Sequence, residues 1–292
     1  MPAATTHFEF AKDAYNLLDE NIKEKITNLP LFYLGSEGPD LFFFSHYVAL
    51  PNSLKKYGDY MHNHNVKETV EFMKDYCSNQ TMLYSYYAGF ICHYALDSNT
   101  HPLINKNAAI NHDNYNCSEG ILHIHSEAEI DAYILQKHDS SINDYNVFKY
   151  IKVTGLEAEA LATMYQQLFS KVYGWKVSKK EILESIRGIS KLTKLLSPNS
   201  TTKYNFVTKV ESLFHLPKFI SGMMLNNKKE HSSVLNEDHS ITFELNENKT
   251  ESASFDELYK KALDEVVKLL NNEIDIERDF TGHSLVSSLP LK

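Results

Sequence analysis

The chain has 292 residues, of which 42% are hydrophobic and 23% are charged, a composition typical of a globular protein with a sizeable core. Its formal net charge of -9 at pH 7 argues against a nucleic acid as partner, because binding a polyanion normally requires a basic surface. The three cysteines, Cys77, Cys92 and Cys117, form no CxxC pair and are typical of buried, reduced thiols.

The segments along the chain have mostly helical periodicity. Residues 1–7 have neither the basic region nor the apolar stretch of a signal peptide, so we expect a cytoplasmic protein. Residues 8–26 then repeat apolar side chains at helical spacing. Only residues 240–245 alternate as a strand would, and no apolar stretch is long enough to span a bilayer. We therefore expect an all-α fold, with further helices at residues 66–76, 121–136, 156–173, 180–196 and 255–270.

Two short stretches place histidines and carboxylates on helix faces, because side chains four residues apart share a face at about 3.6 residues per turn. Brought together in a cleft between helices, two such faces would form a metal cluster. Imidazole nitrogens and carboxylate oxygens without thiolates suit zinc, and this mixture is commoner in catalytic than in structural sites. The two sets are His93, Asp97 and His101, and His123, Glu127 and Asp131.

The helix that carries His93 should begin at residue 80 or 81 and end by His101, because Pro102 disfavours a helical conformation for the residue before it. His101 would then lie at a frayed helix end, where it could serve a second metal beside the first. Gly89, one turn before His93, is expected to leave open space on the same face.

The second histidine set has an alternative, since His125 also stands four residues before an acid, Glu129. We prefer the pair of His123 and Glu127, because Glu127 is followed four residues later by Asp131. That carboxylate would lie outside the metal shell and accept a hydrogen bond from a ligand imidazole, which fixes its tautomer.

Other candidates are weaker when taken singly. Asp40 follows Gly38 and Pro39, where an N-cap of a first helical turn is the simpler interpretation. His62 and His64 lie close together, and His64 is the alternative to His62 as a ligand.

As an ordered set, these residues resemble the zinc-dependent phospholipase C family, whose fold relatives include the single-strand-specific nucleases of fungi and plants. The resemblance covers about residues 6–135. The set comprises an early His, a Gly-Pro-Asp, a His behind Gly-x3, His-x3-Asp, a further His, and His-x3-Glu-x3-Asp. Here these residues are His7, Asp40, His62, His93, Asp97, His101, His123, Glu127 and Asp131.

The resemblance implies a cluster of zinc ions, two of them held by side chains alone. It also implies a third ion, held by Asp97, His7 and the main-chain amine and carbonyl of an N-terminal residue. In the secreted enzymes of the family that residue is a Trp, whereas the only Trp here is Trp175. We therefore expect two zinc ions, or three if the N-terminal site forms. The ligands implied for the first two are Asp40, His62, His93 and Asp97, and then His101, His123 and Glu127.

The function implied by the resemblance is hydrolysis of a phosphate ester by a zinc-bound hydroxide, with Asp40 as both ligand and proton acceptor. A phospholipase C-like phosphodiesterase is the first expectation, and residues 42–44 with Tyr86 and Tyr87 could line an apolar mouth for lipid or belong to the core. The alternatives are a single-strand nuclease or other phosphatase on the same fold, and a non-enzymatic helical protein with structural zinc or none. The sequence predicts neither the head group nor the oligomeric state.

The expected domain organisation is a single domain over residues 1–292. Its metal-site half would span about residues 6–135, and a helical body about residues 136–292. Within that body, residues 226–254 are rich in Asn, Ser, Glu and Lys and are expected to form a long surface loop.

Overall fold

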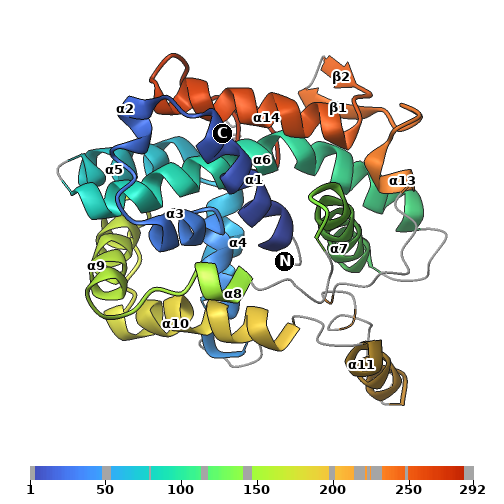
Figure 1. Cartoon of the computed structure of the whole chain (residues 1–292), viewed down its shortest axis with the longest axis horizontal. Coiled ribbons are helices and arrows are strands. Elements are labelled where there is room, and N and C mark those ends of the chain that lie inside the picture. The colour runs from blue at the N-terminus through green and yellow to red at the C-terminus, as the bar shows by residue number, and fades with distance from the viewer. Residues whose placement is uncertain are drawn as a thin grey trace, which may run out of the picture.

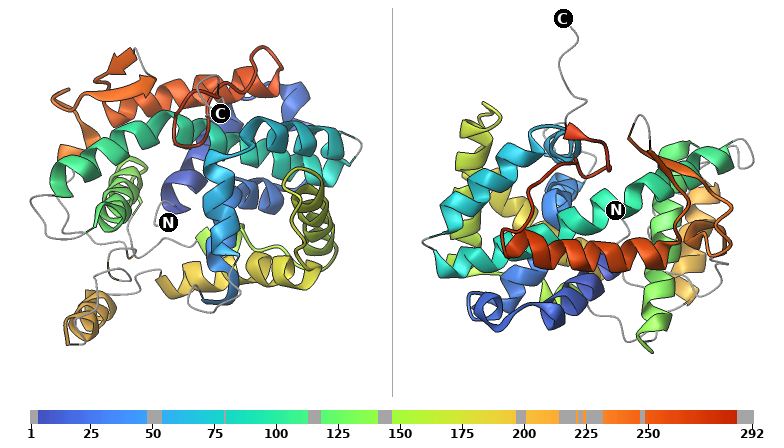
Figure 2. Two further views of the ribbon diagram at one scale, coloured as in Figure 1. Left: turned by 180° about the vertical axis from the view of Figure 1, so that it is seen from behind. Right: turned by 90° about the horizontal axis from the view of Figure 1, so that it is seen from above.

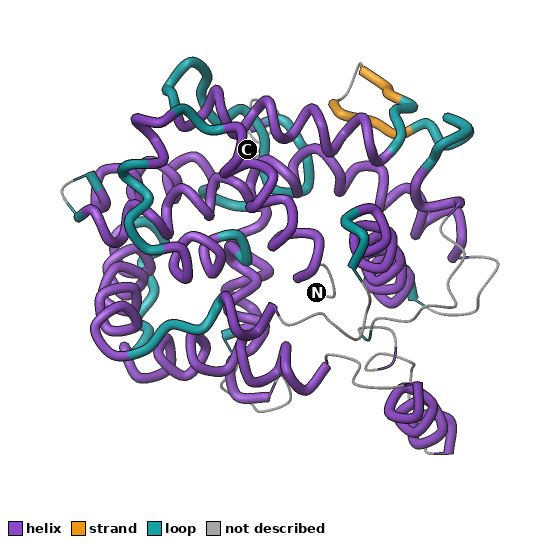
Figure 3. Tube along the Cα trace, in the orientation of Figure 1, coloured by secondary structure: helices purple, strands orange, loops and turns teal. Residues whose placement is uncertain are grey.

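The structure is a computed structural model, and it describes residues 4–47, 54–78, 80–112, 118–140, 147–196, 201–213, 221, 224, 232–246 and 249–285. The regular secondary structure of the described chain is helical apart from one small hairpin, as Figure 3 shows, so the all-α prediction is confirmed. Its small hairpin, β1 (Phe243–Asn246) with β2 (Lys249–Glu251), overlaps the one segment with strand periodicity. The helices are α1 (Ala4–Leu17), α2 (Glu20–Lys23), α3 (Leu29–Gly35), the 3-10 helix η1 (Gly38–Tyr47), α4 (Lys55–Asn63), α5 (Val66–Cys77), α6 (Thr81–His112), α7 (Glu119–Lys137), α8 (Val147–Tyr150), α9 (Gly155–Lys171), α10 (Lys179–Leu196), α11 (Thr201–Leu213), α13 (Ser232–Leu235) and α14 (Phe255–Leu270).

Helix α6 is the central element of the fold. It packs against α1, α3, α5, α7 and α14, and α14 lies beside it in Figure 1 and in the view from behind in Figure 2. Because neighbours surround it, α6 is buried on nearly every side from Leu83 to Leu103 and has no single apolar stripe. No described helix has the length and apolar character needed to cross a membrane.

Helix α6 does not end at His101 as expected, but continues through Pro102 to His112. A proline inside a helix leaves the carbonyl four residues earlier without its intrahelical donor. Here that carbonyl belongs to Ser98, and it accepts a hydrogen bond of 3.2 Å from the guanidinium of Arg278. The prediction was wrong because a residue 180 positions away satisfies the group that Pro102 leaves exposed.

Gly89 does not leave open space beside His93, because α3 fills it. A Cβ on Gly89 would lie 1.9 Å from the carbonyl oxygen of Phe32, and a Cβ on Gly35 would lie 2.2 Å from that of Tyr86. The two glycines therefore let the backbones of α3 and α6 cross in direct contact. This crossing places η1, which begins three residues after Gly35, beside the face of α6 that carries His93.

Two further expectations differ from the structure. Residues 8–26 form α1 and the short α2 instead of one helix, with Leu18 and Asp19 between them. The segment 226–254 is not simply a loop, since its described part contains α13 and the hairpin. By contrast, α14 begins and ends where its periodicity predicts, and a capping box between Ser254 and Glu257 fixes its start.

Candidate metal centre

The face of α6 that carries His93, Asp97 and His101 forms the floor of the site, and all three side chains are buried. Because α6 stays helical past Pro102, His101 keeps the same direction as the other two and does not lie at a frayed end. Asp97 lies among four imidazoles. Its carboxylate oxygens are 3.4 Å from His7 Nε2, 4.0 Å from His62 Nε2, 3.1 Å from His93 Nε2 and 3.8 Å from His101 Nδ1.

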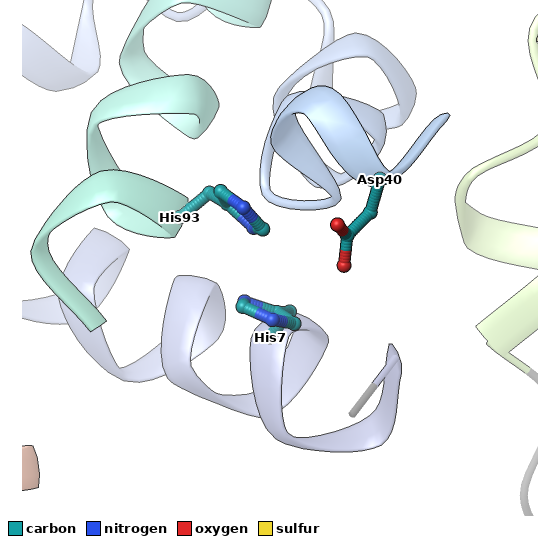
Figure 4. A group of neighbouring side chains, drawn as sticks. All are labelled: His7, Asp40 and His93. Atoms are coloured by element: carbon teal, nitrogen blue, oxygen red, sulfur yellow. The ribbon is translucent and has the colours of Figure 1, made fainter. Parts of the chain in front are cut away.

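The inner cluster, as we call it, consists of His7, Asp40, His62, His93 and Asp97, and it combines residues from α1, η1, α4 and α6. His62 Nε2 lies 3.0 Å from Asp40 Oδ1, and the rings of His7 and His93 stack with their centroids 4.4 Å apart. Figure 4 shows His7, Asp40 and His93 facing a common point. Two triplets of donor atoms within 4.8 Å of one another could each hold a metal ion: His7, Asp40 and His93, and His62, His93 and Asp97.

The outer cluster consists of His101, His123 and Glu127, and it joins α6 to α7. Glu127 Oε1 lies 3.2 Å from His123 Nε2 and 3.7 Å from His101 Nε2. Donor atoms from all three side chains lie within 4.8 Å of one another. Since His101 also approaches Asp97, the two clusters adjoin one another along α6.

The alternatives left open by the sequence lie elsewhere. His64 is outside both clusters, stacks on Tyr60 with ring centroids 3.9 Å apart, and shares a hydrogen bond with the carbonyl of that residue. His125 belongs to none of the described groups that could hold a metal, whereas His123 does.

The imidazoles of the site share one pattern of hydrogen bonding. In four of the five, Nδ1 is hydrogen-bonded to an oxygen atom, so Nδ1–H donates and, in the neutral ring, the lone pair of Nε2 is left for the site. The four acceptors are the carbonyls of Gly58 for His62, Ser36 for His93 and Phe280 for His101, and the side-chain Oδ1 of Asn105 for His123.

Charges within the site are mutually dependent. Burial alone would raise the pKa of Asp97, but the imidazoles of His101, His93 and His7 hold it well below its usual value. Burial would likewise lower the pKa of His101, yet Asp97 and Glu127 raise it to about 9. Burial and the nearby His93 lower the pKa of His7 to about 4. His7 is therefore neutral near pH 7, the form in which an imidazole binds metal.

Asp40 is held as a carboxylate by its neighbours. Burial opposes ionisation, but the hydrogen bond and positive charge of His62, together with the charge of His93, lower the pKa of Asp40. Gly38 makes room for this arrangement. It has φ of +50°, and a Cβ there would lie 2.2 Å from Cδ2 of His93. The glycine of Gly-Pro-Asp is thus required by its backbone conformation and by the ring that it faces.

Asp131 has a different partner from the one expected. Its Oδ1 accepts hydrogen bonds from the main-chain N of Thr6 at 2.8 Å and from Thr6 Oγ1 at 2.6 Å, not from an imidazole. Asp131 thereby ties α7 to the residue that precedes His7. Burial raises the pKa of this carboxyl to about 7, although the bonds from Thr6 oppose the rise.

Two neighbours of the site were missed from the sequence. Glu37 is fully buried, and neither of its carboxylate oxygens has a hydrogen bond to any residue that the structure describes. Burial and the charges of Asp40, Asp131 and Asp97 raise its pKa well above the usual value. Its position, three residues before Asp40, was the only available signal.

The second missed neighbour is Phe280, in a segment that we call the strap (residues 276–285). Its carbonyl accepts the bond from His101, its N–H donates to the carbonyl of His62 at 3.1 Å, and its ring packs on His62 and His93. Arg278 anchors the strap on Ser98, Asn99 and Glu265. No motif in the sequence marks this segment.

The donor set fits zinc. His7 Nδ1 is buried and makes no hydrogen bond in the described structure. His93 Nε2 makes none either, because with the hydrogen on Nδ1 it has none to donate to the Asp97 oxygen 3.1 Å away. A buried imidazole nitrogen without a partner is costly. A metal ion that accepted the lone pair would remove that cost. Buried imidazole nitrogens and carboxylates, four of the imidazoles oriented by acceptors behind them, form the kind of donor set that zinc proteins use.

An all-α chain with such a cluster is a candidate zinc protein. The family model described as zinc dependent phospholipase C matches residues 6–188, which is more than half of the chain, and the protein belongs to this family. The matched region contains both clusters and ends before the strap. Neither the curated proteins nor the solved structures yielded a match to the chain.

Proposed function

We propose that the protein is a zinc-dependent phosphoric ester hydrolase, and more narrowly a phospholipase C-like phosphodiesterase. The observation that carries the proposal is the convergence of two donor clusters on Asp97, in a chain that belongs to the zinc-dependent phospholipase C family. Enzymes that catalyse nucleophilic displacement at phosphorus commonly bind two adjacent metal ions, which stabilise charge on both the attacking and the leaving oxygen.

The proposed ligands follow the two clusters. Asp97 would serve the inner ions, while its contact with His101 couples them to the outer cluster. His7 would complete a third position together with the main chain of an N-terminal residue, and residues 1–3 lie outside the described part of the chain. The first ion would be held by Asp40, His62, His93 and Asp97, and the second by His101, His123 and Glu127.

The chemistry divides between the metal and the protein. Zinc, when bound, supplies a more acidic water and positive charge for the phosphoryl oxygens. The protein contributes Asp40, a carboxylate that His62 keeps ionised and that can accept a proton from the attacking water. The described cysteines are unsuited to nucleophilic attack, because burial raises the pKa of Cys77 to about 12 and that of Cys92 further. Water is therefore the proposed nucleophile.

The family favours a phospholipid or a soluble analogue as substrate. Most of the aromatic residues considered for a lipid-binding mouth are core, since Phe42 and Tyr86 are fully buried and Tyr87 is nearly so. Among the described members of that set Phe43 is the exception, being partly exposed and stacked on His62 with ring centroids 5.8 Å apart, while the side chain of Phe44 lies outside the described structure. The proposed substrate therefore rests on the family and on the metal centre, and Phe43 is the aromatic side chain of the described set that we propose to meet it.

The test combines metal analysis with two assays. Protein purified without chelator is expected to contain at least two zinc ions per chain and to cleave a chromogenic phosphocholine ester, with activity lost to a zinc chelator and restored by zinc. Single-stranded DNA is the comparison substrate, and faster cleavage of DNA would favour the nuclease alternative despite the charge of -9. Zinc without hydrolysis of either substrate would favour a structural role, and a protein that binds no zinc would overturn the proposal.

A further inference from the structure

The acceptors behind the imidazoles are not equivalent. Three are main-chain carbonyls, which every residue type supplies, but the acceptor for His123 is the side-chain Oδ1 of Asn105, at 2.8 Å from Nδ1. Asn105 lies on α6 one turn after His101, and its side chain is exposed. His123 is thus the one ligand candidate among the four whose orientation depends on a replaceable side chain.

This hydrogen bond determines which ring nitrogen carries the proton. A neutral imidazole has one N–H, and an oxygen acceptor at Nδ1 keeps the hydrogen there. Nε2 faces the outer cluster, with Glu127 Oε1 3.2 Å away, and with the hydrogen on Nδ1 its lone pair is left for a cation that the carboxylate would bind as well. If the amide of Asn105 were turned over, its NH2 group would face Nδ1 and favour the tautomer with hydrogen on Nε2, which cannot bind metal.

We propose that Asn105 is a positioning residue that holds His123 in the metal-binding tautomer and thereby sets the zinc affinity of the outer cluster. The proposal rests on zinc binding at this cluster, as proposed above, and adds a residue outside the ligand set. A purely structural role for Asn105 would be minor, because an exposed hydrogen bond contributes little to folding.

The test compares three variants with the full-length wild type. Asn105→Ala removes the acceptor, Asn105→Asp keeps an oxygen at this position, and Asn111→Ala removes an amide on the same helix that bonds to Asn107 instead of a ligand. Zinc affinity of each chelator-treated protein is measured by competition with a chromogenic chelator. Long-range 1H–15N spectra of the metal-free protein report the tautomer of His123, and thermal unfolding reports folding.

Asn105→Ala is expected to lower the zinc affinity of the outer cluster about 10- to 100-fold, the usual effect of losing an acceptor behind a metal-bound histidine. It should also lose the Nδ1–H signature of His123, with inner binding and the unfolding temperature unchanged. Asn105→Asp should retain or tighten binding, and Asn111→Ala should match the wild type.

Wild-type affinity in Asn105→Ala, or equal weakening in Asn105→Asp and Asn105→Ala, would overturn the inference, as would a wild-type protein that binds no zinc. A wild type that binds zinc but hydrolyses nothing would instead overturn the proposed function while leaving the role of Asn105 supported or refuted by its own affinity. The two failures are therefore distinguishable.

Discussion

The inner and outer clusters share the same helix and the same kinds of donors, yet they are held in different ways. In the inner cluster, His62 and His93 are oriented by the main-chain carbonyls of Gly58 and Ser36. The side chain of His93 is also fully buried. In the outer cluster, 24% of the His123 side chain is exposed and its acceptor is a surface amide, while His101 depends on the strap.

The difference indicates unequal metal sites. Burial excludes water from the inner cluster, and the strap, which also packs on His62 and His93, supplies neither of their Nδ1 acceptors. The outer cluster instead takes its Nδ1 acceptors from a surface amide and from the strap, which solvent or a loosened strap can disturb. We therefore expect the inner ion to bind more tightly and the outer ion to exchange with solution. The following predictions would break or sharpen that contrast.

The largest effect is expected where the clusters meet. Asp97→Ala removes the carboxylate that lies among four imidazoles, so it should abolish activity and lower the metal content below that of His7→Ala. His7 belongs to the inner cluster but not to the ligand set proposed for the first ion, so its loss should affect mainly a third ion. Elemental analysis of the two variants, purified side by side, checks the ranking. Equal metal loss would contradict it.

Metal removal should follow the same order as exposure. On addition of a zinc chelator, the ion at the outer cluster should leave at least about tenfold faster than the inner ion, because its donors are less completely fixed. If both ions are needed for hydrolysis, activity should be lost at the rate of the faster phase of zinc release. Stopped-flow absorbance of the chelator gives the two rates. A single phase carrying all of the metal would show that the clusters behave as one unit.

A change at Gly38 should damage the inner cluster alone. Gly38→Ala puts a Cβ against the His93 ring at a residue with φ of +50°, so it should cost more than the roughly 1–2 kcal/mol of left-handed strain. Gly174→Ala is the matched control, since Gly174 has φ of +68° and nothing within 4 Å of the added Cβ. Chemical unfolding of both metal-free variants gives the difference. Equal destabilisation by Gly38→Ala and Gly174→Ala would mean that the His93 ring moves aside to accommodate the added methyl group.

A change in the strap should act on the outer cluster from a distance. Arg278→Met removes the donors to Ser98 and Glu265, which should lower the free energy of unfolding by about 1–3 kcal/mol. It should also lower the zinc affinity of the outer cluster, because Arg278 anchors the strap, and the strap residue Phe280 supplies the carbonyl that accepts the hydrogen bond from His101. Lys268→Met, which breaks only an exposed pair with Asp264, is the control and should leave zinc affinity unchanged. Zinc titration of both variants separates local from general destabilisation.

Much of the fold was predictable because helical periodicity is a local signal. The bounds of α5, α7, α9, α10 and α14 lie within two residues of the predicted ones. The errors arise where a distant residue changes a local preference. Pro102 is tolerated because Arg278 takes up the carbonyl of Ser98, and Gly89 makes close contact with α3 instead of leaving space.

The candidate site shows the same division between local and distant information. Spacing by four along α6 and α7 placed most of the proposed ligands, and the structure brings these residues together. The acceptors behind them could not be foreseen, since Phe280 is 179 residues from His101, and Asn105 is 18 residues before His123 on another helix. Asp131, the acceptor that spacing suggested, binds Thr6 instead.

The smallest effects are expected at the two histidines that the sequence offered as alternatives. His64→Ala should keep wild-type metal content and activity, because its ring stacks on Tyr60 outside the inner cluster. His125→Ala should do the same, because His123, one turn before Glu127 on α7, is the histidine of this pair that belongs to the outer cluster. His62→Ala and His123→Ala are the matched comparisons, and each should lose about one zinc ion per chain. Elemental analysis with the phosphocholine ester assay distinguishes the members of each pair. If His125→Ala lost metal and His123→Ala did not, the outer cluster would have to be rebuilt around Glu129, and the contrast between the two clusters would no longer rest on Asn105.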